Sequence, residues 1–160
     1  MWAVLTPLLL MLSVIDWRTR LLPTRLIIPA TIAVILVGLV AALVERDLQV
    51  WIRALLGMLA LRTFLWILWA LRQGGMGFGD VRLGALVGFV LGWFGWAEVI
   101  IGIYAALGCF SLFVVGAAAL KRDRSRLKLF TPFGPFLVAG GFVGAWFGPA
   151  IAAYLGYGSG

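Results

Sequence analysis

The sequence predicts an all-α membrane protein with six transmembrane helices, and two observations carry this prediction. Hydrophobic residues make up 64% of the 160 residues and charged residues only 12%, far outside the composition of a soluble domain. The apolar residues also form continuous runs rather than short alternating strands. Because lipid cannot hydrogen-bond to backbone amides, such runs are expected to form helices surrounded by membrane lipid.

Six apolar runs define the expected helices, at 2–15, 26–44, 50–70, 81–94, 97–120 and 133–155. The first has no Lys or Arg before it, so it lacks the basic start of a secretory signal and is expected to remain as a span. The second, third, fifth and sixth approach the roughly 20 residues that a helix needs to cross the hydrocarbon core. The first and fourth are shorter, which indicates a thinned or water-filled region beside them. The whole chain, 1–160, is then a single membrane domain.

The charged residues between these runs predict the orientation of the chain. Basic residues follow the first, third and fifth runs, as Arg18, Arg20, Arg25, Arg72, Arg82, Lys121, Arg122, Arg124, Arg126 and Lys128. The opposite loops hold Glu45, Arg46, Asp47 and Glu98. By the positive-inside rule, the basic loops face the cytoplasm and both termini lie outside.

Composition also excludes several classes of function. The net charge of +7 is not expected to serve nucleic acid, because the basic residues sit in short loops between apolar runs. The chain has no histidine and one cysteine, Cys109, inside an apolar run. A disulfide framework, a Cys/His zinc site and a His-based catalytic triad are therefore excluded within this chain, and no metal or cofactor is expected.

Two aspartates are the candidate catalytic groups. Asp16 ends the first run and Asp80 opens the fourth, so the predicted topology places both at cytoplasmic helix ends. An ionisable side chain at membrane depth is costly and points to function where a partner can be named, and each is the other's candidate partner. Two facing carboxyls can share one proton, so that one activates water while the other polarises a peptide carbonyl.

A structural alternative is that Asp16 and Asp80 merely balance neighbouring arginines such as Arg18, Arg20 and Arg82. The setting of Asp80 favours function, because it closes the sequence Gly-Gly-Met-Gly-Phe-Gly-Asp over 74–80. Glycines at this density break a helix and let another backbone approach closely, as binding of an extended peptide requires.

These residues resemble a known family. Gly77-Phe78-Gly79-Asp80 matches the GxGD pattern of intramembrane aspartic proteases, and its extension MGFGDVRL over 76–83 resembles the type IV prepilin peptidase version. Asp16 stands seven residues before Pro23 in DWRTRLLPTRLIIP, as in prepilin peptidases. The segment Phe133-Gly134-Pro135-Phe136-Leu137 is similar to the family's FGP segment at the start of the last helix.

The resemblance implies a GxGD-type protease fold in the inner (cytoplasmic) membrane, with Asp16 and Asp80 as its catalytic pair. It implies that the substrate is a prepilin or pseudopilin, whose basic leader lies in the cytoplasm ahead of an apolar helix. Residues expected to bind substrate or shape the site are Gly77, Phe78, Gly79, Arg82, Pro23, Phe133, Gly134 and Pro135.

Departures from the family pattern leave alternatives open. Long-form members carry an N-terminal domain with paired CxxC motifs that methylates the product; only fifteen residues precede Asp16, so methylation is not expected. Thr24 stands where the family often has an acid or amide, and Arg82 where it often has lysine.

Two alternative functions stay open. One is a small proton-coupled transporter, although the sequence shows no internal repeat of the kind that many transporters have; the other is a non-catalytic membrane scaffold. Arg62, inside the third run, either contacts a substrate carboxylate or extends toward an interface, and the oligomeric state stays open.

Overall fold

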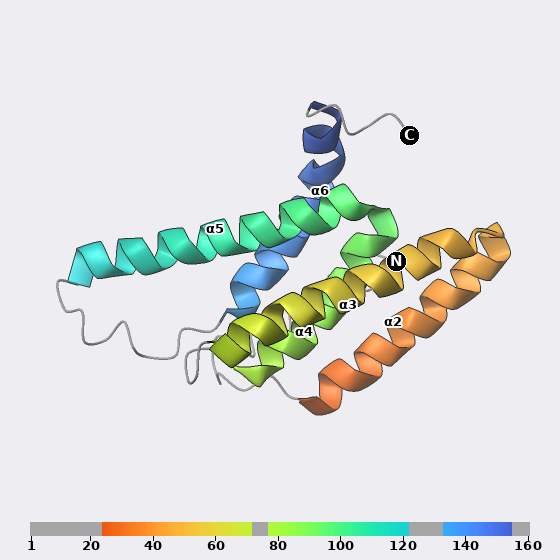
Figure 1. Cartoon of the computed structure of the whole chain (residues 1–160), viewed down its shortest axis with the longest axis horizontal. Helices are drawn as coiled ribbons and strands as arrows, with labels where there is room; N and C mark the ends of the chain where they lie inside the picture. Colours follow the sequence, from red (N-terminus) through yellow and green to blue (C-terminus); the bar gives the residue numbers. More distant parts are fainter. Residues whose placement is uncertain (1–23, 72–76, 122–132, 155–160) are drawn as a thin grey trace.

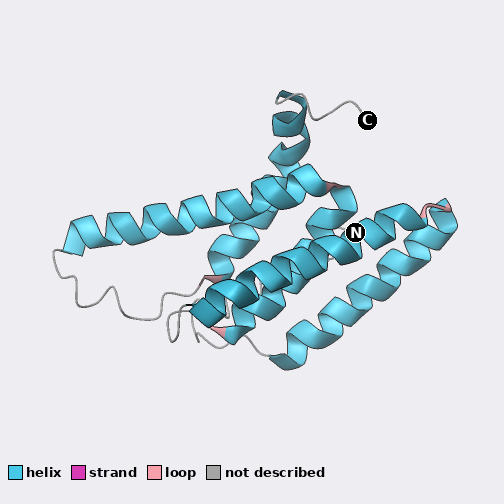
Figure 2. Cartoon of the chain, in the orientation of Figure 1, coloured by secondary structure: helices cyan, strands magenta, loops and turns pink. Residues whose placement is uncertain are grey.

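The computed structural model describes residues 24–71, 77–121 and 133–154, and these ranges are helical apart from short turns (Figure 2). The helices are α2 Thr24–Glu45, α3 Leu48–Leu71, α4 Phe78–Phe94, α5 Trp96–Lys121 and α6 Gly134–Tyr154. The all-α prediction is confirmed over these residues, and each helix boundary falls within one turn of the predicted run. The run at 2–15 lies outside the described residues.

Four of the described helices are long and apolar enough to cross a membrane. The stretches are Ile27–Glu45, Leu48–Leu71, Trp96–Gly116 and Gly134–Ile151, which identifies the chain as an integral membrane protein. They expose large apolar side chains outward, for example Val40 of α2 and Leu112 of α5, as lipid-facing helices do. The six-span count stays a prediction.

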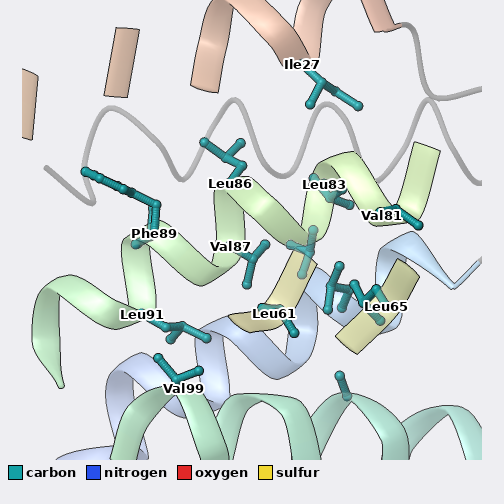
Figure 3. Close-up of a cluster of buried hydrophobic side chains, with 14 of the residues drawn as sticks. Ile27, Leu61, Leu65, Val81, Leu83, Leu86, Val87, Phe89, Leu91 and Val99 are labelled. Carbon is teal, nitrogen blue, oxygen red and sulfur yellow. The ribbon is translucent and has the colours of Figure 1, made fainter. Parts of the chain in front are cut away.

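Helix α4 lies at the centre of the described bundle. It contacts α2, α3, α5 and α6, whereas the other helices surround it (Figure 1). All its residues from Leu83 to Gly92 are buried, and Leu86, Phe89 and Leu91 are fully enclosed (Figure 3). This explains the shortness of the fourth run: with 17 residues, α4 is covered by protein along most of its length and does not have to match the lipid thickness alone.

Glycines bring α3 and α4 into backbone contact. A Cβ built onto Gly88 would lie 2.6 Å from the carbonyl oxygen of Gly57, and one on Gly57 would lie 2.8 Å from the carbonyl oxygen of Gly88. A Cβ built onto Gly92 would likewise lie 3.0 Å from the Cα of Ala54. Without a large apolar driving force between helices in lipid, such close approach supplies the packing that holds the pair together.

The same device joins α5 to α6. A Cβ on Gly140 would lie 2.5 Å from the carbonyl oxygen of Gly102, and one on Gly144 would lie 2.9 Å from the Cα of Gly102. A Cβ on Gly148 would meet the Glu98 side chain at 2.8 Å. The four-residue spacing of Gly140, Gly144 and Gly148 therefore marks a packing face of the last helix.

An arginine caps the far end of α4. Arg53 of α3 donates from Nε to the carbonyl oxygen of Gly92 (3.0 Å) and from Nη2 to those of Trp93 (2.9 Å) and Phe94 (3.1 Å). The last carbonyls of a helix have no partner within the helix, and a cation there also opposes the negative end of the helix dipole. Arg53 thus links α3 to the end of α4 opposite Asp80.

Candidate active site

Asp80 occupies the first turn of the central helix. Gly77 is the N-cap, with φ −71° and ψ 138°, and the backbone N–H of Asp80 donates to the carbonyl oxygen of Gly77 at 3.1 Å. The Asp80 side chain is only 3% exposed. Helix α4 begins at Phe78, three residues before the predicted apolar run, because an acid in the first turn is favoured by the helix dipole. Asp80 is therefore part of the helix, not of the connection ahead of it.

A side chain at Gly77 would meet few of the described atoms. The nearest described atoms to a Cβ built on Gly77 are Oδ2 of Asp80, at 3.9 Å, and the backbone nitrogen of Gly79, at 4.0 Å. Both are ordinary van der Waals distances, and the φ of Gly77 suits any residue. Among the described residues, nothing in the fold requires glycine here, in contrast to Gly88.

Three side chains pack together at the start of α4, and we name them the Trp69–Phe78–Arg82 stack. The Arg82 guanidinium lies 5.0 Å from the centroid of the Phe78 ring, within the range of a cation–π interaction. The Trp69 ring, from the end of α3, meets the Phe78 ring edge-on, with centroids 5.2 Å apart and planes at 72°. Phe78 and Arg82 were predicted to shape the site, whereas Trp69 was not.

The FGP segment builds the start of α6. Phe133 is buried, and its carbonyl oxygen accepts a hydrogen bond of 3.0 Å from the N–H of Leu137. The Phe133 ring packs edge-on against the ring of Phe110 in α5, with the ring centroids 5.2 Å apart. Gly134 opens the helix and Pro135 follows in the first turn, where proline needs no hydrogen-bond partner. The described ring contacts of this segment are made with α5, and its role toward a substrate stays a prediction.

Other predicted residues divide into those described and those not. Asp16 and Pro23 lie outside the described residues, so the pairing of Asp16 with Asp80 stays a prediction. Arg62 is exposed on α3, which decides neither of its two interpretations. Glu98, predicted to be held by an outer loop, lies instead in the first turn of α5, where it is buried against α6. Within the described ranges, no group of three His, Cys, Asp or Glu gathers in a metal-binding arrangement.

Comparison with known proteins gives consistent similarities. A family model described as the type IV leader peptidase family matches residues 3–159. A "Prepilin leader peptidase/N-methyltransferase" of Burkholderia pseudomallei is 38% identical over 149 residues, which cover 92% of this chain and 46% of that protein. A protein of the same name from Bacillus subtilis is 33% identical over 150 residues, covering 92% of this chain and 55% of its own length. The chain thus spans about half the length of these curated relatives. No solved structure matches it.

Proposed function

Since the chain belongs to the type IV leader peptidase family, we propose that it is an intramembrane aspartic endopeptidase that removes the basic leader from prepilin or pseudopilin precursors. The observation that carries the proposal is the placement of Asp80. Its buried carboxyl lies in the first turn of the central helix, and a Cβ built on Gly77 would lie 3.9 Å from its Oδ2, with no other described atom nearer, the chain neighbours of Gly77 aside. A peptide backbone needs this combination of close approach and a held acid.

The second acid of the proposed pair is Asp16. Helix α2 begins at Thr24, eight residues after Asp16, and its residue Ile27 belongs to the same buried core cluster as Leu83 of α4 (Figure 3). The start of α2 therefore lies at the same end of the bundle as the start of α4 (Figure 1). Eight residues can extend to roughly 28 Å, so a meeting of the two carboxyls is within the reach of the chain.

The proposed mechanism needs only these two acids and water. The ionised carboxyl takes a proton from a water molecule that attacks the scissile peptide carbonyl. The protonated carboxyl hydrogen-bonds to that carbonyl and then protonates the leaving amine. The burial of Asp80 lowers the local dielectric, which strengthens the electrostatic interactions of its carboxyl.

The membrane topology belongs to the same proposal. We infer that the single domain 1–160 crosses the inner (cytoplasmic) membrane six times. Both termini then lie outside, and the basic loops lie in the cytoplasm. Asp80 then lies at the cytoplasmic end of α4, where the basic leader of a precursor meets its apolar helix. Pro23, Phe133, Gly134 and Pro135 would shape this end of the bundle.

A reconstitution assay tests the proposed function. The purified protein in lipid nanodiscs is incubated with a full-length prepilin, and the products are sequenced by mass spectrometry. We expect a single cut between the basic leader and the apolar helix. An intact prepilin, with Asp80-dependent proton flux across proteoliposomes, would favour the transporter instead; an intact prepilin without flux would favour the scaffold.

Replacement of Gly77 by alanine is expected to impair cleavage without unfolding the protein. The new methyl group meets no described atom closer than 3.9 Å, so the melting temperature should stay within a few degrees of the wild type. It would nevertheless fill the space beside Asp80, and a displacement of the substrate carbonyl by about 1 Å costs roughly 10²-fold in rate. The measurements are thermal unfolding in detergent and the initial cleavage rate.

Gly108 provides the matched control, because a Cβ built on this α5 residue meets nothing within 4 Å. Gly108→Ala should keep both stability and cleavage. If Gly77→Ala cleaves as fast as Gly108→Ala, then the space beside Asp80 is not used by the substrate.

A further inference from the structure

One face of α3 packs along α4, and its contacts extend as far as the first turn of α4. Gly57, Leu61, Leu65 and Trp69 recur every four residues and so lie on one face of the helix. Leu61 and Leu65 are fully buried, and they lie against Gly88 and Gly84 respectively. Trp69 comes one turn later and reaches Phe78, the first residue of α4. Trp69 is thus the last contact of an antiparallel seam.

The first turn of α4 depends on contacts from outside the helix. The first N–H groups of a helix lack the usual partner one turn earlier, and among them that of Asp80 bonds locally to the carbonyl oxygen of Gly77, so packing from a neighbouring helix adds to the hold on this turn. The sequence just before it, at 72–77, contains Gly74, Gly75 and Gly77, which have no side chain with which to hold the turn. Within the Trp69–Phe78–Arg82 stack, Trp69 is the member that comes from another helix.

Asp80 shares this first turn with Phe78. Phe78 is two residues before Asp80, and Arg82, two residues after it, stacks back on the Phe78 ring. Phe78 and Arg82 are four residues apart and so share one face of this turn, whereas Asp80 lies on the other face. Trp69 holds Phe78, and with it this turn, against α3. Rotation or fraying of this turn would move the carboxyl out of its 3% exposed setting.

We propose that Trp69 is a positioning residue of the active site, which holds the Asp80 carboxyl in place through its edge-on contact with the Phe78 ring. As a statement about catalysis, this rests on the proposed function. Trp69 touches neither Asp80 nor the reacting atoms in this proposal. Its effect should therefore appear in turnover rather than in substrate binding, and an aromatic replacement should preserve it.

The matched variants are Trp69→Leu, Trp69→Phe and Trp66→Leu. Trp66 is on the same helix, is 50% exposed and makes no ring contact with another described residue, so it controls for loss of a lipid-facing indole. With a prepilin substrate, Trp69→Leu should lower kcat about tenfold and change KM by less than about twofold, since the aromatic pair of Trp69 and Phe78 is lost while the contact of Arg82 with Phe78 remains. Trp69→Phe should stay within about threefold of the wild type, because it retains an aromatic edge.

A second readout does not depend on cleavage. In a Cys109→Ala background, which removes the chain's one cysteine, Asp80→Cys introduces a single thiol at the buried position. Its labelling by a water-soluble maleimide should be slow, should rise about fivefold or more with Trp69→Leu, and should not change with Trp66→Leu. Melting temperatures of all variants are measured in parallel.

Three results would overturn the proposal: equal effects of Trp69→Leu and Trp66→Leu, unchanged thiol labelling in Trp69→Leu, or a kcat loss that Trp69→Phe shares in full. If the wild-type protein does not cleave prepilins at all, the proposed function fails, and the labelling arm alone decides whether Trp69 positions residue 80.

Discussion

Asp80→Asn should abolish leader cleavage while leaving the helices in place, and Asp16→Asn should do the same. Asparagine keeps the volume of aspartate and a hydrogen-bonding side chain, so the 3% exposed position at 80 should tolerate it structurally. It cannot accept or deliver the proton, and a positioned acid or base contributes about 10²- to 10⁴-fold to the rate. We expect each single variant to lose at least that much, measured as the initial rate of prepilin cleavage.

The double variant distinguishes a pair from two independent acids. If Asp16 and Asp80 share one proton, removal of either disables the unit, and Asp16→Asn combined with Asp80→Asn should be hardly slower than each single variant. Asp47→Asn is the control: Asp47 is exposed and caps α3 by accepting a hydrogen bond of 3.1 Å from the N–H of Gln49, a role that asparagine also performs. Near-normal cleavage by either single variant at Asp16 or Asp80 would refute the paired mechanism.

The sequence predicted the described helices well because the solvent imposes them. In lipid every backbone N–H and C=O group must find its hydrogen-bond partner within the protein. A continuous apolar run does so by forming a helix. The four-residue spacing of glycines on α6 is also visible in the sequence, and it is explained by the close approach of Gly140 to Gly102, because residues four apart share a helix face. The GxGD segment likewise identified Asp80 as an acid with an unusual setting.

The contacts between helices could not be predicted from the sequence. The run that became α4 is apolar on all sides, which is as typical of a lipid-facing span as of a buried one, so its central place was not predicted. The cap that Arg53 places on Gly92, Trp93 and Phe94 joins residues about forty positions apart. Trp69 was missed for the same reason, although its four-residue spacing from Leu65 and Leu61 was a usable signal.

Gly88→Val should have the largest effect on stability among the single substitutions considered. A Cβ at this position would lie 2.6 Å from the carbonyl oxygen of Gly57, 2.9 Å from the Cβ of Leu61 and 3.1 Å from the carbonyl carbon of Gly57. Two of these three atoms belong to the backbone, so a new side-chain rotamer cannot remove the clash with them. Helices α3 and α4 must therefore move apart. We expect a loss of about 3 kcal/mol in the free energy of unfolding, the upper part of the range for overpacking, measured by unfolding in detergent.

This variant also separates two ways of losing activity. Forcing α3 from α4 should displace the seam from Gly57 to Trp69 and, with it, the first turn that holds Asp80, so Gly88→Val should lose stability and cleavage together. Gly77→Ala should lose cleavage alone, and Gly108→Ala neither. A normal melting temperature for Gly88→Val would contradict the glycine contact between α3 and α4. The position of Asp80 would then have to be set by contacts other than this seam.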